Sequence, residues 1–206
     1  MNKKIGMIAS AANGFFVASF GVLTAIGLLD VDVFYWAVIA SIFIALSFVP
    51  MVAAFAAKCK QEAKAKGNTA MIFAAIYATF ILMVYFTQIT TLHNESIGEE
   101  IGFMLNYLNF SWFFNLNLLG YGIMSLSTFF AGLTIYTQSK GDKVLKGMLM
   151  GHGIFFVSSF IMPVLGVFTN MDGTDATWIG GTVLLIWSAI FLPISILSFN
   201  YFRKGV

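Results

Sequence analysis

The sequence FYWAVIASIFIALSFVPMVAAFAAKCKQEAKAKGN (residues 34–68) joins two segments of opposite character. Residues 34–57 contain no charged side chain, whereas the segment after them carries Lys58, Lys60, Lys64 and Lys66. An α-helix needs about 20 consecutive apolar residues to cross the hydrocarbon core of a bilayer. The first segment meets that length, and the lysines indicate on which side of the membrane it ends. The rest of the chain divides in the same way.

The composition is typical of a protein embedded in lipid. Hydrophobic residues make up 59% of the 206 residues and charged residues only 10%, whereas a soluble domain carries about 25% charged residues. Six stretches are apolar and long enough to span a bilayer: residues 5–29, 33–57, 69–92, 113–137, 147–168 and 177–202. We therefore predict an all-α membrane protein, a single integral membrane domain over residues 1–206 in which six transmembrane helices form a bundle.

The connection between the third and fourth stretches is unusually long. Its segment IGEEIGFMLNYLNF (residues 97–110) is too short and too polar to cross the bilayer, and aromatic residues recur in it at helical intervals. A helix of this kind lies in the plane of the membrane surface. We predict a short interfacial helix over about residues 97–110, on the outer side.

The basic residues indicate how the chain is threaded. All 11 Lys and Arg residues lie before the first stretch or after the second, fourth and sixth. With six crossings these four positions face one side of the membrane, and short loops rich in Lys and Arg stay in the cytoplasm. Most acids occupy the other connections, and only Glu62 and Asp142 share the basic side. We predict a multi-pass protein of the plasma (inner) membrane with both termini cytoplasmic and the lipid bilayer as its main partner.

The interior of every predicted span lacks Asp, Glu, Lys and Arg. Ionisable side chains inside membranes mark proton relays, ion pathways and retinal counter-ions, so this pattern disfavours proton pumps, proton-coupled antiporters and retinal proteins. The single cysteine, Cys59, can form no internal disulfide. The motifs of phosphate-binding loops, zinc proteases and serine hydrolases are absent from the sequence. We predict no metal, no cofactor and no nucleic-acid partner, and an enzyme is the least favoured class.

The fourth span has one polar and one apolar face. Asn117 and Tyr121 fall on the polar face, which suits a neighbouring helix or a cavity. The outer ends of the third and sixth spans add polar and aromatic residues, and the full set of candidates for an outward-facing ligand pocket is Tyr85, Gln88, Asn117, Tyr121, Trp178 and Thr182. The alternatives are an interhelical hydrogen bond for Asn117 and an interfacial aromatic belt for the tyrosines and tryptophan.

Two other polar residues lie within predicted spans, toward the cytoplasmic side. An intramembrane histidine is a functional candidate by default, but His152 has no acid, cysteine or second histidine in any span with which to bind a metal. We predict that His152 is neutral and hydrogen-bonded to another helix or near the inner interface. Asn13 in the first span is a polar residue of the same kind.

Three segments carry a resemblance to a known group of proteins: YFTQITTL (residues 85–92), LGYGIMSLSTFFAG (residues 119–132) and IWSAIFLPISILSFNYFRK (residues 186–204). They look like segments of small six-span prokaryotic inner-membrane proteins that share a domain of unknown function. The resemblance implies a six-helix inner-membrane protein and supplies no catalytic residue.

Three classes of function remain compatible with these patterns. The favoured class is a binding, accessory or sensing membrane component, which fits the uncharged spans and the lack of a catalytic motif. The alternative is a small transporter or channel for a neutral or amphiphilic molecule, with the outer polar residues as its site. A lipid-modifying enzyme would have only His152 and scattered hydroxyls to use. Possible partners are a neutral or lipid-like ligand, a second copy of the chain, or a larger membrane complex.

Overall fold

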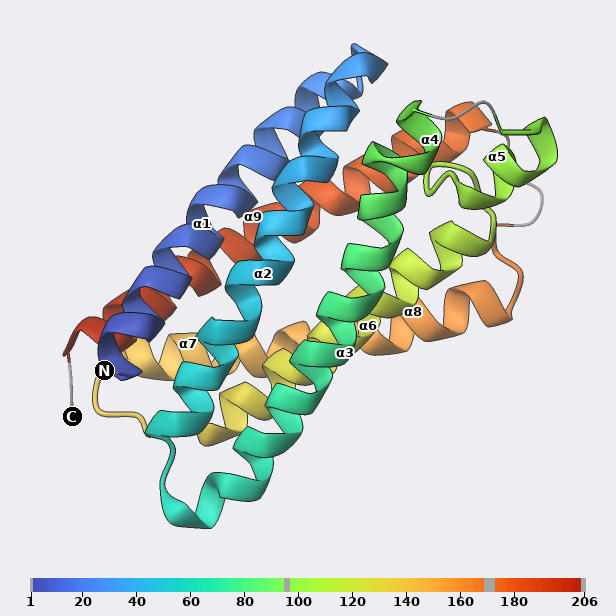
Figure 1. Cartoon of the computed structure of the whole chain (residues 1–206). Helices are drawn as coiled ribbons and strands as arrows, with labels where there is room; N and C mark the ends of the chain where they lie inside the picture. Colours follow the sequence, from blue (N-terminus) through green and yellow to red (C-terminus); the bar gives the residue numbers. More distant parts are fainter. Residues whose placement is uncertain (1, 95–96, 169–172, 205–206) are drawn as a thin grey trace.

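The computed structural model describes residues 2–94, 97–168 and 173–204, and all regular structure in them is helical (Figure 1). The long helices are α1 (Asn2–Gly27), α2 (Phe34–Lys58), α3 (Lys64–Ile89), α6 (Trp112–Thr134), α7 (Lys140–His152), α8 (Phe155–Val164) and α9 (Gly173–Lys204). Shorter elements are α4 (Thr91–Asn94), α5 (Glu99–Leu105) and the 3-10 turns η1 (Val31–Val33) and η2 (Gln61–Ala63). The predicted all-α class is confirmed.

Six segments of the described chain are long and apolar enough to cross a membrane, which is typical of a multi-pass membrane protein. They are Asn2–Gly27, Phe34–Lys58, Gln61–His93, Trp112–Thr134, Lys140–Val164 and Trp178–Lys204. Each overlaps one predicted span. The predicted spans and these six segments were both identified by length and apolar composition, and they therefore overlap.

The helices form a bundle whose two ends differ in charge. At one end α1 begins, α9 ends, and the α2–α3 and α6–α7 connections turn (Figure 1); we call this the basic end, because the lysines and arginines lie in or beside these four segments. We call the opposite end the acidic end. Along the bundle α1 packs against α2 and α9, α2 against α3, α3 against α6, and α6 against α7 and α8. Helices α8 and α9 are not a closely packed pair within the described residues.

The fifth span differs from the continuous helix predicted over residues 147–168. It begins earlier, at Lys140, and divides into α7 and α8 at Gly153 and Ile154. There the backbone switches to tighter hydrogen bonds: Gly153 N donates to Met150 O at 3.1 Å and Ile154 N donates to Gly151 O at 3.1 Å. Such a 3-10 turn changes the direction of a helix. The predicted continuous helix is therefore interrupted by a turn, after which α8 packs on α6.

The predicted interfacial helix over residues 97–110 is also shorter than expected. Helix α5 covers only Glu99–Leu105, and an irregular segment follows it. The Asn106 side chain accepts a hydrogen bond from Leu108 N at 2.9 Å, and the Asn109 side chain donates to Phe103 O at 3.2 Å. Asparagine side chains that bond the nearby backbone compete with a helix and favour a turn. The helical interval of the aromatic residues did not reveal this competition.

A buried asparagine joins three helices in the basic half of the bundle. The Asn13 carboxamide nitrogen donates to Ile44 O and to Ser47 Oγ, both at 3.1 Å. Its oxygen accepts from Ser195 Oγ at 2.9 Å. Helices α1 and α9 come close enough for this contact because Gly14 faces Ser195, and a Cβ at Gly14 would lie 3.3 Å from the Ser195 Cβ. Small residues allow such close approach of helices in apolar surroundings.

The basic end is tied together by charged and polar contacts. The Asp142 carboxylate accepts from Ser139 N at 3.0 Å and forms an ion pair with Lys204 Nζ at 3.0 Å. The Ser139 hydroxyl in turn accepts from Asp142 N, completing a capping box at the start of α7. Lys58 Nζ donates to Tyr201 O at 3.0 Å and so satisfies a carbonyl in the last turn of α9. These contacts connect the end of α9 to α2 and α7.

We predict that Asn13→Leu lowers the free energy of unfolding by about 1–3 kcal/mol, because leucine has a similar size but makes none of the three hydrogen bonds. Denaturant or thermal unfolding in detergent micelles measures the change. The control is Asn115→Leu, which alters an exposed residue of α6 and should change stability by less than about 0.5 kcal/mol. Equal stability of the two variants would contradict the structural role of Asn13.

Candidate functional site

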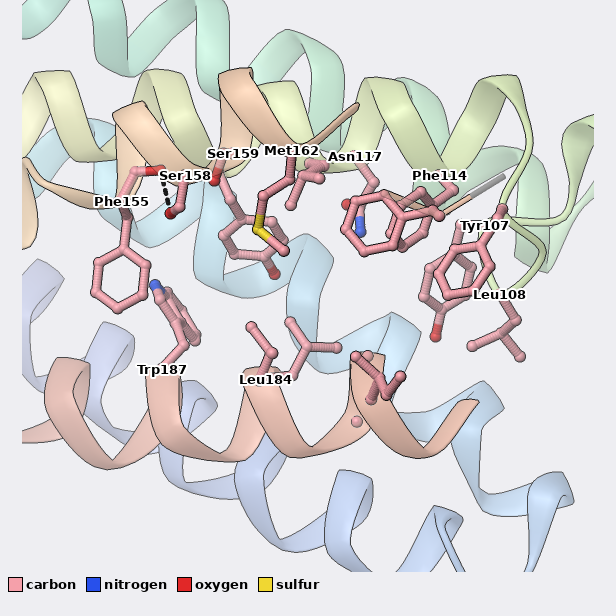
Figure 2. Close-up of a pocket in the computed structure, with 18 of the residues that line it drawn as sticks. Tyr107, Leu108, Phe114, Asn117, Phe155, Ser158, Ser159, Met162, Leu184 and Trp187 are labelled. Atoms are coloured by element: carbon pink, nitrogen blue, oxygen red, sulfur yellow. Dashed lines mark hydrogen bonds between the residues drawn. The ribbon is translucent and has the colours of Figure 1, made fainter. Parts of the chain in front are cut away.

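A cavity of about 300 Å³ lies between α6, α8 and α9 in the acidic half of the bundle (Figure 2). Its walls come from four regions of the chain: the start of α2, the α5–α6 segment with α6, α8 with Phe168, and α9. The lining residues are Phe34, Tyr107, Leu108, Phe110, Phe114, Asn117, Leu118, Tyr121, Phe155, Ser158, Ser159, Met162, Phe168, Ile179, Gly180, Gly181, Val183, Leu184 and Trp187. None of these carries a charge. A cavity of this size and lining is typical of a site for a small apolar molecule.

The cavity exists because α8 and α9 follow different partners. Helix α8 packs on α6 through Ser159, which sits against Gly122; a Cβ at Gly122 would lie 3.1 Å from the Ser159 Cβ. Helix α9 packs on α1, and Gly181 is so close to Leu28 that an added Cβ would lie 2.6 Å from its Cδ2. The neighbouring Gly180 faces open space. The two helices thus leave a gap, which the side chains of Figure 2 line from opposite sides.

The end of the cavity nearer the basic end is closed by a hydrogen-bonded group. Trp187 Nε1 donates to His152 Nε2 at 3.1 Å, and His152 Nδ1 lies 2.8 Å from the Thr128 hydroxyl. That hydroxyl donates to Ser125 O at 2.8 Å, so it accepts from the histidine. Both ring nitrogens therefore have a defined role, with the proton on Nδ1 and a lone pair on Nε2. His152 is neutral in this arrangement, and its predicted hydrogen bonding to other helices is confirmed.

Aromatic rings surround the indole of Trp187. The ring of Phe191 stacks on it at 5.0 Å, and that of Tyr121 meets it edge-on at 5.2 Å. His152 contacts Phe191 at 5.2 Å from another side. These neighbours cover Trp187, which is only 4% exposed. The ring contacts and the hydrogen bond to His152 also fix its orientation. It therefore forms a rigid wall between the cavity and the basic half of the bundle.

Behind the α6 wall lies a buried group of hydroxyls from α2 and α3. Tyr85 Oη lies 3.5 Å from Tyr121 Oη, and Ser41 and Asn117 also lie near the Tyr85 hydroxyl. Within the described residues, the hydroxyls of Ser41 and Tyr77 and the Oδ1 atom of Asn117 are buried without a hydrogen bond. Most buried polar atoms in proteins are paired. Of these three side chains, only Asn117 also lines the cavity.

The six predicted pocket residues separate in the structure. Asn117 and Tyr121 line the cavity, and Tyr85 supports Tyr121 from behind. The Gln88 carboxamide instead donates to Leu105 O at 2.8 Å and holds the end of α5. Trp178 is 50% exposed and Thr182 is exposed on the surface of α9. The predicted common pocket must therefore be corrected: Gln88, Trp178 and Thr182 do not line this cavity.

The orientation of Trp178 away from the cavity has a geometric cause. Successive residues of a helix are rotated by about 100°, so Trp178 and Gly180 point in nearly opposite directions. Docking of Gly181 on Leu28 decides which of these faces turns inward. Gly180, Leu184 and Trp187, spaced by four and three residues, form the face that lines the cavity. The sequence contains that spacing, but every face of an α-helix has residues spaced by three and four, so the spacing does not show which face points inward.

The chemistry available to this site is recognition without charge. No group of three or more metal-binding side chains occurs in the part of the chain that the structure describes. His152 has both nitrogens occupied by Thr128 and Trp187. The cavity offers aromatic and aliphatic surface, together with the Asn117 carboxamide and the hydroxyls of Tyr107, Ser158 and Ser159. Such a lining is chemically suited to uncharged apolar or amphiphilic molecules and unsuited to charged ones.

The chain matches no protein-family model, no curated protein sequence and no solved structure. The resemblance to six-span proteins with a domain of unknown function thus stays a prediction.

We predict that His152→Leu lowers the free energy of unfolding by about 1–3 kcal/mol, because it leaves the buried Trp187 Nε1–H without an acceptor. Unfolding in detergent micelles measures this loss. His93→Leu is the control, since His93 is the other histidine and is exposed. A His152→Leu variant as stable as the control would show that the His152 hydrogen bonds do not stabilise the bundle.

Proposed function

We propose that the six apolar segments cross a membrane, with the basic end in the cytoplasm. The support is the placement of the lysines and arginines at one end of the bundle, which is the arrangement that the positive-inside rule describes. Exposed apolar side chains along α8, such as Val157 at 55% and Val164 at 72%, would then face lipid. The cavity between α6, α8 and α9 lies in the outer half of the membrane in this orientation.

We further propose that the protein is a membrane component that binds a neutral apolar or amphiphilic molecule in this cavity. The observation that carries the proposal is the uncharged cavity of about 300 Å³, lined by four regions of the chain and closed at one end by Trp187. Its lining excludes a charged ligand, because a charge moved from water into apolar surroundings without a partner is strongly destabilised. We propose that the ligand enters from the lipid between α8 and α9, which are not closely packed against each other in the described residues.

Binding is favoured over transport by the closed end of the cavity. Passage toward the basic end would require Trp187 to leave His152, Tyr121 and Phe191 together. A binding or sensing protein needs no such movement. Ligand transfer across reconstituted vesicles, abolished by a cavity-filling variant, would replace this proposal with the transport alternative.

The proposed orientation predicts which sites a membrane-impermeant maleimide can reach in intact cells. In a Cys59→Ser background, Glu99→Cys should be labelled directly and Lys143→Cys only after permeabilisation, because both residues are exposed but at opposite ends. Cys59 itself is a poor reporter, since it is 9% exposed and its thiol donates to Ala56 O. The reverse labelling pattern would invert the orientation.

The proposed ligand site predicts saturable quenching of Trp187 fluorescence. The other three tryptophans, Trp36, Trp112 and Trp178, are at least half exposed, so their replacement by phenylalanine leaves Trp187 as the sole emitter. Titration with bromodecanol, an uncharged chain that ends in a bromine quencher, should give saturable quenching in lipid nanodiscs. Unbrominated decanol should reverse it by competition.

Two glycine substitutions provide the matched test of location. Gly180→Leu fills the cavity, because a Cβ at Gly180 meets no atom within 4 Å, and it should weaken binding at least about tenfold, as expected when contacts worth about 1.4 kcal/mol are lost. Gly151→Leu also enters open space, away from the cavity, and should leave binding unchanged. Quenching that rises linearly with probe and is the same in both variants would show only contact with probe dissolved in lipid.

A further inference from the structure

We infer that the ligand carries an uncharged hydroxyl group that Asn117 recognises, so that the protein selects amphiphilic alcohols over hydrocarbons, ethers and charged lipids. This inference rests on the proposed binding function and adds the chemical class of the ligand. It is carried by the carboxamide oxygen of one side chain of the cavity wall, which accepts no hydrogen bond from the described residues.

Asn117 is placed at this wall by the periodicity of α6. It shares a face with Gly120, Tyr121 and Met124, all of which are buried. Asn117 is 7% exposed and lines the cavity. Figure 2 shows its carboxamide directed from α6 toward the space in front of α9.

The carboxamide oxygen of Asn117 is buried and accepts no hydrogen bond from any described residue. Leaving a polar atom unpaired in apolar surroundings is unfavourable. The buried Asn13 and the partly buried Gln88 do not show this deficit. Asn13 uses both of its ends, in contacts of 2.9–3.1 Å, and Gln88 donates to two backbone carbonyls. Among the described residues, the hydroxyls of Ser10, Thr24, Ser41 and Tyr77 are also buried without a hydrogen bond. Of these five residues, Asn117 is the one that lines the cavity.

A hydroxyl is the neutral group that best fits this carboxamide. The Asn117 oxygen requires a donor, and its nitrogen can donate to an acceptor. A hydroxyl provides both through one atom, whereas an ether or ketone can only accept and a hydrocarbon can do neither. A carboxylate or ammonium group would find no charged partner among the cavity residues.

The depth of Asn117 also orients the ligand. Asn117 lies one helical turn, about 6 Å, nearer the acidic end than Tyr121, whose ring contacts Trp187. The stretch of α9 that lines the cavity, from Ile179 to Trp187, is about 12 Å long. A hydroxyl at Asn117 therefore sits in the outer part of the cavity, and the apolar chain extends inward to the aromatic wall at Trp187.

The decisive experiment compares bromodecanol with its methyl ether, which differs by loss of the hydroxyl hydrogen and gain of a methyl group. Both are titrated against the sole-tryptophan protein in nanodiscs, at matched mole fractions in the lipid. We expect the alcohol to bind about 3–10-fold more tightly than the ether, the range that one neutral hydrogen bond supplies. In Asn117→Leu this ratio should fall to about 1 with binding of the ether retained, whereas Asn115→Leu should keep the full ratio.

The unfolding temperature distinguishes a loss of folding from a loss of the preference for the alcohol. Since Oδ1 of Asn117 has no partner, Asn117→Leu should unfold at the same temperature as the parent protein or higher. Asn117→Ala serves as a second variant with less bulk and should lose the same preference. Equal affinity for alcohol and ether in the parent protein, or a preference that survives both substitutions, overturns the inference while binding itself stands. Failure of both probes to quench saturably overturns the binding function and this inference with it.

Discussion

The hydrogen bonds of His152 hold together the part of the bundle on which the cavity depends. One ring nitrogen bonds Thr128 of α6 and the other bonds Trp187 of α9, at 2.8 and 3.1 Å. Helix α7 ends at His152, and after the turn at Gly153 and Ile154 helix α8 packs on α6. In apolar surroundings neither nitrogen can exchange its partner for water. The histidine therefore joins α6, α7 and α9 at the level where α8 and α9 separate, and the cavity begins on top of this junction.

The polar residues of the bundle show two different uses of a hydrogen-bonding group among apolar neighbours. Asn13, Gln88 and His152 are paired with backbone or side-chain atoms of other elements, and each stabilises the contact that it makes. Asn117 has an oxygen without a partner, so it contributes no comparable contact. The hydroxyls of Ser10, Thr24, Ser41 and Tyr77 are also unpaired among the described residues, but these residues do not line the cavity, and the proposed recognition of a ligand hydroxyl therefore concerns Asn117.

Part of the site was predictable because residues three or four apart lie on the same face of an α-helix. The polar face of α6 was expected from the spacing of Asn117 and Tyr121, and both residues are buried. The contribution of α9 was not predictable. Trp178 and Trp187 are both tryptophans of the same apolar segment, yet Trp178 is 50% exposed and Trp187 is 4% exposed. The rotation of α9 is decided by Gly181 against Leu28, a contact between residues far apart in the chain.

The sequence by itself determined that the protein is helical, that six segments are apolar enough to span a membrane, and that its cations gather at one end. These properties depend on composition and on the local repeat of the backbone, so they can be read from each segment separately. Only the tertiary structure decided that α8 follows α6 while α9 follows α1, that His152 bonds Thr128 and Trp187, and that Asn117 remains unpaired. Those features depend on the rotation and tilt of whole helices, which are decided by side-chain packing between distant segments and leave no periodic trace in the chain.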